Sequence, residues 1–498
     1  MFKLRVPSLL TALLFTVPFC GTTHADVVEV PEMENQRRVG VIYKMSVTPA
    51  RESVPAFKYR LTVEPHKTIP GNAVTHYLRS LGENSLNRPW ETAQNEFGME
   101  VYDWSSLKTK VEDIPLDKLK TVAGYFDFYV ENHLRRATLC RDCEWGLAIE
   151  DLSEREIIEF PLPSVQQTRS MARALLLRNR LAVIEGRYDD SVDHLRMTYQ
   201  LGQNVGKLRF LVANLVGIAE VRMANQGMVH LMAAKDSPNM YWALAELRRP
   251  IVSVRESQRL ESSFPLRYCP QLIGVEDADY SKEKWREMLA ELMDSLQYAR
   301  TTSGQIRLGD KDNLAFAAAL AGFASAKQRL IESGMDAQAV NQMPVAQVIL
   351  IDAARDCRGF SQDIEKSYYL PFEKAGEFVR TVETQLRESA PTRLGALIVD
   401  QLASATAQVR QAEVRAQAQI DILMAIESIR NHIAVHGDLP KSLDELELPV
   451  RDNPFTGKPF NYMFKGETAV LSLPRERGMP WSIQYEISIN KPSMEDNQ

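Results

Sequence analysis

Apolar residues recur at helical spacing through most of the chain. Segments such as Leu116–Leu139 and Gln166–Glu185 carry apolar side chains every three or four positions, and clusters of Pro, Gly and Asn separate them. This pattern predicts a mainly α-helical protein built as an array of helical hairpins. We assign residues 71–250 to a helical-hairpin domain and residues 251–437 to a second helical region, which ends in a long helix near Leu394–Val435.

The clearest helical hairpin lies in Met171–Leu201. A turn that contains Gly186, Tyr188, Asp189 and Asp190 joins its two apolar helices. A glycine followed by an aromatic residue and acidic residues resembles the turn of a tetratricopeptide repeat. A stable repeat array needs at least three stacked copies, and the neighbouring sequence shows no matching period. We therefore expect one tetratricopeptide-like hairpin within a larger helical array.

The two ends of the chain have strand-like sequence. Residues 26–70 are rich in Val, Pro and charged residues, which predicts an extended N-terminal arm of short strands and loops. Residues 438–498 begin with a helix stop at Pro440. Apolar and polar residues then alternate in three runs: Asn461–Phe464, Ala469–Leu473 and Trp481–Ile489. The alternation predicts a small α+β cap of antiparallel strands at the C-terminus.

Residues 1–25 have the pattern of a secretory signal peptide. Lys3 and Arg5 precede an apolar stretch, Val6–Phe19, and small residues lead to a cleavage site after Ala25. The apolar stretch is shorter than the roughly 20 residues that a bilayer-spanning helix needs. We therefore expect an exported protein, periplasmic or extracellular after cleavage near Ala25, with no membrane span in the mature chain.

The charge balance excludes nucleic acid as a partner. The chain has 59 basic and 65 acidic residues, and removing residues 1–25 leaves 57 basic and 65 acidic residues, a net charge of −8. Nucleic-acid binding depends on an excess of Lys and Arg that neutralises phosphates. With 45% hydrophobic and 25% charged residues, the composition is that of a folded protein with a buried core.

Four cysteines remain once Cys20 leaves with the signal peptide: Cys140, Cys143, Cys269 and Cys357. In an oxidising compartment an even number of cysteines predicts disulfides, here two bridges in any of three connectivities.

Cys140 and Cys143 form a C-x-x-C motif, with Trp145 close behind it. A redox motif of thioredoxin type has its first cysteine at a helix N-terminus, where the helix dipole stabilises the thiolate. Here the motif follows the predicted helix Leu116–Leu139, and no second C-x-x-C completes a zinc site. The pattern favours a structural disulfide or buried thiols, with a redox-active pair as the alternative.

Trp145, Tyr241 and Trp242 are candidates for an aromatic surface that binds a peptide or a glycan. Tyr241 and Trp242 also fit a hydrophobic core, because Leu244 and Leu247 follow them at helical spacing. The sequence alone leaves both interpretations open, and the core interpretation is the simpler one.

No metal site, cofactor or catalytic residue is predicted. His432 and His436 have the four-residue spacing of helical metal ligands, but the segment HIAVH has no Glu between them. A His near a helix C-terminus is also favoured by the helix dipole. The chain contains no G-x-S-x-G, G-x-G-x-x-G or P-loop motif, so it lacks the signatures of common hydrolases, dinucleotide enzymes and nucleotide triphosphatases.

Six stretches along the chain form a distinctive combination. They are AFKYRL from Ala56, PGNA from Pro70, CEWGL from Cys143, NMYWAL from Asn239, MPVAQV from Met343 and DNPFTGKPF from Asp452. Together they resemble an uncharacterised family of exported, helix-rich proteins of planctomycete-type bacteria. The resemblance implies an exported helical protein and no particular activity. In that family the cysteine of the C-[DE]-W-G motif is the typical one, so Cys140 is particular to this chain.

The segments LPKSLDEL, from Leu439, and DNPFTGKPFNY, from Asp452, also resemble the periplasmic end of type II secretion pseudopilins. This second resemblance implies an association with an envelope machine. Pseudopilins begin with a long apolar helix that this chain lacks at the corresponding place, so filament assembly does not carry over.

The sequence therefore predicts an exported helical scaffold without catalytic activity, which binds a protein partner in the periplasm or envelope. The alternative is a periplasmic enzyme or redox protein centred on Cys140 and Cys143.

Overall fold

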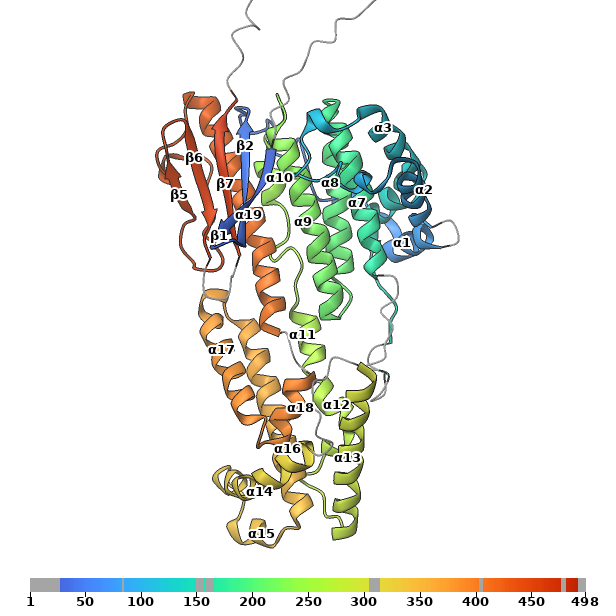
Figure 1. Cartoon of the computed structure of the whole chain (residues 1–498), viewed down its shortest axis with the longest axis vertical. Helices are drawn as coiled ribbons and strands as arrows, with labels where there is room; N and C mark the ends of the chain where they lie inside the picture. Colours follow the sequence, from blue (N-terminus) through green and yellow to red (C-terminus); the bar gives the residue numbers. More distant parts are fainter. Residues whose placement is uncertain are drawn as a thin grey trace, which may run out of the picture.

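The computed structural model describes residues 27–82, 85–148, 165–303, 314–402, 406–475 and 481–490, together with residues 152 and 156. The protein is mainly helical, as predicted, with a small sheet made largely of antiparallel strands. The molecule is elongated: the sheet and several long helices lie at one end, and a second group of helices extends away from them (Figure 1). The predicted signal peptide, residues 1–25, lies outside the described residues.

The helices at the sheet end come mainly from the first half of the chain. They are α1 (Ala73–Leu81), α2 (Asn87–Phe97), α3 (Leu116–Tyr125), α4 (Asp127–Tyr129), α5 (Arg135–Leu139), α7 (Val165–Ile184), α8 (Tyr188–Val205), α9 (Leu211–Ala233) and α10 (Tyr241–Ala245). The second group consists of α11 (Arg255–Glu261), α12 (Phe264–Tyr268), α13 (Lys282–Ser303), α14 (Leu314–Glu332), α15 (Ala337–Gln342), α16 (Val345–Lys366), α17 (Phe372–Ser389) and α18 (Leu394–Leu402). Helix α19 (Thr406–His436) returns from this group to the sheet (Figure 1).

Helices α7, α8, α9 and α19 form the centre of the sheet end. α9 packs against α7, α8 and α19, and it is buried on nearly all sides. The contact between α8 and α9 is close because it passes through Gly202 and Gly217: a Cβ atom on Gly217 would lie 2.4 Å from the Gly202 carbonyl oxygen. The long helix predicted near Leu394–Val435 corresponds to α18 and α19, and residues 403–405 between them lie outside the described residues.

The hairpin predicted in Met171–Leu201 is present as α7 and α8. Gly186 has φ +69°, the left-handed conformation that ends many helices. The backbone N–H groups of Gly186 and Arg187 donate to the carbonyls of Val183 and Ala182, which closes the end of α7. These bonds reverse the chain and let α8 pack back along α7.

The sheet joins the two ends of the chain. Its strands lie in the order β1 (Val27–Glu34), β2 (Arg37–Val47), β7 (Ser482–Ile489), β6 (Thr468–Leu473) and β5 (Asn461–Phe464). The antiparallel pairing of β5, β6 and β7 confirms the predicted C-terminal strands. Residues 26–70 were predicted to form an extended N-terminal arm of short strands and loops; within this range, β2 pairs in parallel with β7 over the whole length of β7. Pairing between strands that are so distant in sequence leaves no local pattern.

One face of this sheet forms part of the main core. Alternate residues of β2, β6 and β7 are buried, as expected for strands with one covered face. They share a hydrophobic cluster with α8, α9 and α19, and Figure 1 shows α19 beside the sheet. The sheet and the two long helices α9 and α19 therefore face each other across a common interior.

A second hydrophobic cluster lies around α1–α5 and α7, and it includes Trp90 and Phe126, whose ring centres are 4.7 Å apart. The short parallel pair β3 (Ile69–Asn72) and β4 (Cys140–Asp142) lies at its edge and holds the C-x-x-C segment. Within the described part of the chain, no helix is long and apolar enough to cross a membrane.

Candidate functional site

The four cysteines are not joined by disulfides in the structure, and Cys140 and Cys143 are partly buried. Cys269 and Cys357 are fully buried. Cys140 begins the extended strand β4, where the backbone rises about 3.3 Å per residue, or about 10 Å over three residues. The Cα atoms of a disulfide lie about 4.4–6.8 Å apart, so this extended segment does not favour a bridge between Cys140 and Cys143.

The C-x-x-C segment is held in place by the end of α8. The Trp145 indole N–H donates to the Asn204 carbonyl at 2.9 Å, and the Cys143 thiol donates to the same oxygen at 3.7 Å. Burial raises the pKa of Cys143 to about 12, and burial also raises the pKa of Cys140. A reactive cysteine needs a lowered pKa, so this environment is the opposite of a redox centre.

The three candidate aromatic residues do not form one surface. Trp145 packs on the second hydrophobic cluster, whereas Tyr241 and Trp242 pack in the main core. Tyr241 is only 3% exposed, and its hydroxyl donates to the Pro449 carbonyl. The Trp242 indole donates to Glu52 Oε2 at 2.7 Å. All three rings therefore have packing roles, which agrees with the core interpretation of Tyr241 and Trp242.

A polar cavity of about 450 Å³ lies between the sheet and the helices α9 and α19. Four basic side chains line it, against one acidic side chain, Glu29; the basic residues are Arg38, Lys108, Arg222 and Arg415. They come from β2, the segment after Trp104, α9 and α19 respectively. We call this space the basic cavity. The cavity therefore carries an excess of positive charge, although the whole chain has a net charge of −6.

The basic cavity contains guanidinium groups without a counter-ion. Arg38 pairs with Glu29 at 3.0 Å, and its guanidinium lies 5.1 Å from the centre of the Trp481 ring. Among the described residues, Arg222 and Arg415 have no acidic partner. Burial lowers the pKa of Arg415, and the like charge of Arg222 lowers it further. A bound anion would relieve both effects, because it supplies the missing opposite charge.

Unsatisfied polar atoms point to the same conclusion. Arg415 Nε and Gln419 Oε1 are buried and have no hydrogen-bond partner among the described residues. Buried polar atoms in native proteins nearly always have a partner, so a water molecule or a ligand group is expected beside these two atoms. Burial raises the pKa of Tyr43, which also lines the cavity, to about 12, so its hydroxyl stays protonated near neutral pH. The cavity thus offers donors that suit carboxylate or phosphate oxygens.

A cavity in the second helical group provides a contrast. Its volume is about 380 Å³, and its lining includes Arg329, Asp352, Asp356 and Arg393. Arg329 Nε donates to Asp352 at 2.9 Å, and Arg393 Nε donates to Asp356 at 2.9 Å. Each guanidinium also donates through a second nitrogen to the same carboxylate. These arginines are neutralised by carboxylates, whereas no carboxylate in the described part of the chain pairs with the exposed Arg222 or the half-buried Arg415.

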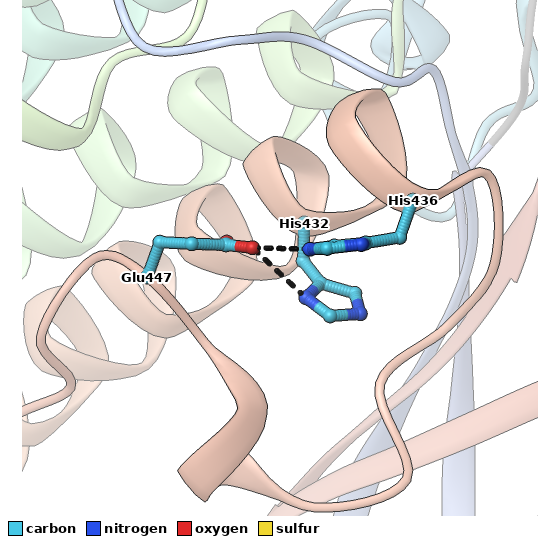
Figure 2. A group of neighbouring side chains, drawn as sticks. All are labelled: His432, His436 and Glu447. Carbon is cyan, nitrogen blue, oxygen red and sulfur yellow. Dashed lines mark hydrogen bonds and ion pairs between the residues drawn. The ribbon is translucent and has the colours of Figure 1, made fainter.

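The structure also brings a carboxylate to the histidine pair at the end of α19. Glu447 Oε1 lies 2.6 Å from His436 Nε2 and 3.5 Å from His432 Nδ1 (Figure 2). Burial alone would raise the pKa of Glu447. Hydrogen bonds with its own backbone N–H and with the His436 side chain outweigh this effect and hold the pKa below its usual value. No metal site was predicted from the sequence because HIAVH has no internal Glu. The carboxylate comes instead from a loop eleven residues after His436.

Comparison with protein-family models, curated proteins and solved structures finds no match to this chain.

The residues that complete both sites were not predicted from the sequence. Arg222 and Arg415 lie on helices that are far apart in the chain, and neither belongs to a recognisable motif. The sequence held one hint of the basic cavity: Arg222 is a charged residue between Val221 and Met223 on the mostly apolar helix α9. Glu447 had no signal of its own.

Proposed function

We propose that the protein is an exported helical scaffold without catalytic activity, which holds an acidic protein partner in the periplasm or envelope through the basic cavity. The unbalanced charge of Arg222 and Arg415 carries this proposal. The acidic segment of the partner would place Asp or Glu side chains against these guanidinium groups. Polar side chains that line the cavity, such as Gln226 and Gln419, would form hydrogen bonds with the backbone of that segment. A volume of about 450 Å³ is within the range of ligand pockets.

The scaffold part of the proposal rests on the helical-hairpin architecture. The α7–α8 hairpin resembles a tetratricopeptide unit in its turn, and stacked helical hairpins commonly present binding surfaces. The proposal that the protein is exported rests on the pattern of residues 1–25, on the resemblance to exported helix-rich proteins, and on the pseudopilin-like segment after Leu439.

The alternative, a redox enzyme centred on Cys140 and Cys143, has less support. Burial raises the pKa of Cys143 to about 12, which disfavours the thiolate that such an enzyme would use. The indole of Trp145 and the thiol of Cys143 both donate to Asn204, a role that positions the segment against α8.

The test is a binding titration of the full chain with two peptides that differ only in charge. One peptide carries consecutive Glu residues, and the other carries Gln at the same positions. We expect the Glu peptide to bind and the Gln peptide not to bind. The variant Arg222→Gln/Arg415→Gln should weaken binding at least tenfold, because hydrogen bonds to charged groups contribute about 1.5–3 kcal/mol each. Arg387→Gln is the control, since its side chain is 74% exposed on α17.

Citrate provides the small-molecule arm of the same experiment. Equal binding of the two peptides, or equal binding to the wild-type chain and the double variant, would contradict the proposal. Binding of citrate in preference to the Glu peptide would replace the protein partner by a small carboxylate ligand. Binding of the Glu peptide should also weaken as salt concentration rises, because the interaction is between charges.

A further inference from the structure

The end of α19 carries two imidazoles on one face. His432 and His436 are four residues apart, one helical turn, and their ring centres are 4.3 Å apart. The chain then turns back through the segment Leu443–Glu445, a short 3₁₀ helix, and places Glu447 against both rings (Figure 2). One ligand atom from each of the three side chains lies within 4.8 Å of the other two.

We propose that His432, His436 and Glu447 bind one Zn²⁺ ion. Two imidazole nitrogens and one carboxylate oxygen form a ligand set that zinc takes in proteins with three protein ligands and an open fourth position. Mg²⁺ and Ca²⁺ prefer sites made of oxygen ligands, which this group is not. Zinc–ligand distances are about 2.0–2.2 Å, so ligand atoms around one ion lie roughly 3.3 Å apart, near the separations of 2.6 and 3.5 Å in the structure.

An unsatisfied buried nitrogen is independent evidence for a ligand here. His432 is 6% exposed, and its Nδ1 is buried with no hydrogen-bond partner among the described residues. This nitrogen faces Glu447, 3.5 Å from Oε1, which is too long for a hydrogen bond. A metal ion between the two groups would satisfy both the nitrogen and the carboxylate.

Neighbouring residues hold the carboxylate in place. Asn431 Nδ2 donates to Glu447 Oε2 at 3.4 Å, which leaves Oε1 directed at the histidines. Asn431 Oδ1 in turn accepts from the Glu52 backbone N–H at 2.9 Å. Such outer contacts orient the ligands of metal sites, so Asn431 is a positioning residue.

The open fourth position faces solvent. The side chain of His436 is 48% exposed and that of Glu447 is 38% exposed, whereas His432 forms the buried wall. Bound zinc would therefore tie the end of α19 to the loop that leads into the sheet. The site is distinct from the basic cavity, because Arg415 lies 17 residues earlier on α19, about 26 Å along the helix.

The test is a titration of the metal-free full chain with Zn²⁺ alone, followed by calorimetry. We expect one ion per chain and a higher melting temperature with zinc bound. The variants His436→Ala and Glu447→Gln, which change exposed side chains, should each weaken zinc binding at least about tenfold. Co²⁺ should bind the same site and give the visible absorption of a four-coordinate ion.

Two control variants make the result specific. His66→Ala removes an exposed histidine at a distant position, and Cys140→Ser/Cys143→Ser removes the thiols of the C-x-x-C segment. Both should bind zinc as the wild-type chain does. Undiminished binding to His436→Ala and Glu447→Gln, loss of binding in the cysteine variant, or the absence of binding to the wild-type chain would each overturn the proposal. Circular dichroism of every variant separates loss of the site from loss of the fold.

Discussion

Arg222 on α9 and Arg415 on α19 line one cavity with like charges, and repulsion from Arg222 adds to burial in lowering the pKa of Arg415. Neither guanidinium has an acidic partner among the described residues. In the second helical group, by contrast, Arg329 pairs with Asp352 and Arg393 pairs with Asp356. A local arrangement that opposes stability is expected where a protein binds something else.

The first prediction is that Arg415→Gln separates stability from binding. Glutamine removes a partly buried charge and its repulsion from Arg222, so the free energy of unfolding should stay the same or rise by about 1 kcal/mol. Citrate should raise the melting temperature of the wild-type chain more than that of the variant, because the variant keeps only Arg222 of the two guanidinium groups without an acidic partner. A loss of more than about 2 kcal/mol on substitution would mean that Arg415 supports the fold and is not held there for binding.

The second prediction concerns pH. Glu220 is fully buried on α9, and burial raises its pKa from 4.5 to about 8. In the unfolded chain this carboxyl loses its proton near its ordinary pKa, whereas in the folded chain it keeps the proton up to about pH 8. The folded state therefore binds more protons between these values, and stability falls as pH rises through that window. One such group contributes about 1.4 kcal/mol per pH unit.

Glu220→Gln removes this contribution, since glutamine has no proton to lose. The variant should show a shallower fall of the free energy of unfolding between pH 5 and pH 8 in urea titrations, by up to about 1.4 kcal/mol per pH unit. Burial also raises the pKa of Glu261 to about 7. This residue should therefore preserve part of the pH dependence of stability in the variant. Parallel stability curves for the variant and the wild-type chain would show that Glu220 ionises normally in the fold.

The third prediction concerns Arg430, which is fully buried on α19. Its Nη1 donates to Glu427 at 2.9 Å, its Nε to the Thr48 carbonyl at 2.9 Å, and its Nη2 to the Ser237 carbonyl at 2.9 Å. One guanidinium thus ties α19 to the end of β2 and to the chain after α9. Arg430→Met should lower the free energy of unfolding by about 3–5 kcal/mol, because it leaves Glu427 buried without its basic partner.

Urea denaturation measures this effect against an exposed ion pair. Arg387 pairs with Glu383 at 3.8 Å on the surface of α17, and Arg387→Met should change stability by less than about 0.5 kcal/mol. The buried pair and the surface pair should therefore differ about tenfold in energy. Equal effects of the two substitutions would show that Arg430 does not hold α19 against β2.

The fourth prediction concerns the thiols. Cys269 and Cys357 are fully buried, and burial raises the pKa of Cys143 to about 12. In the folded chain prepared without residues 1–25, and so without Cys20, Cys140 should therefore react fastest with a thiol reagent and the other three slowly. All four should react rapidly after denaturation without reductant. Fewer than four reactive thiols after denaturation would reveal a disulfide, and fast reaction of Cys143 in the folded chain would revive the redox alternative.

The helices and C-terminal strands were predictable because each has a local signal. The turn at Gly186 and the alternation in Thr468–Leu473 lie within windows of about ten residues. The pairing of β2 with β7 had no such signal, since it depends on two segments at opposite ends of the chain. The two sites could not be predicted from the sequence for the same reason. Only the tertiary fold places Arg222 and Arg415 in one cavity, and Glu447 beside His432.

A crystal structure of the chain with the Glu peptide bound would show directly whether the basic cavity holds an acidic segment. We expect a peptide carboxylate within about 3 Å of the guanidinium groups of Arg222 and Arg415, in the cavity between the sheet and helices α9 and α19. A peptide bound elsewhere on the molecule, with the basic cavity filled only by water, would contradict it.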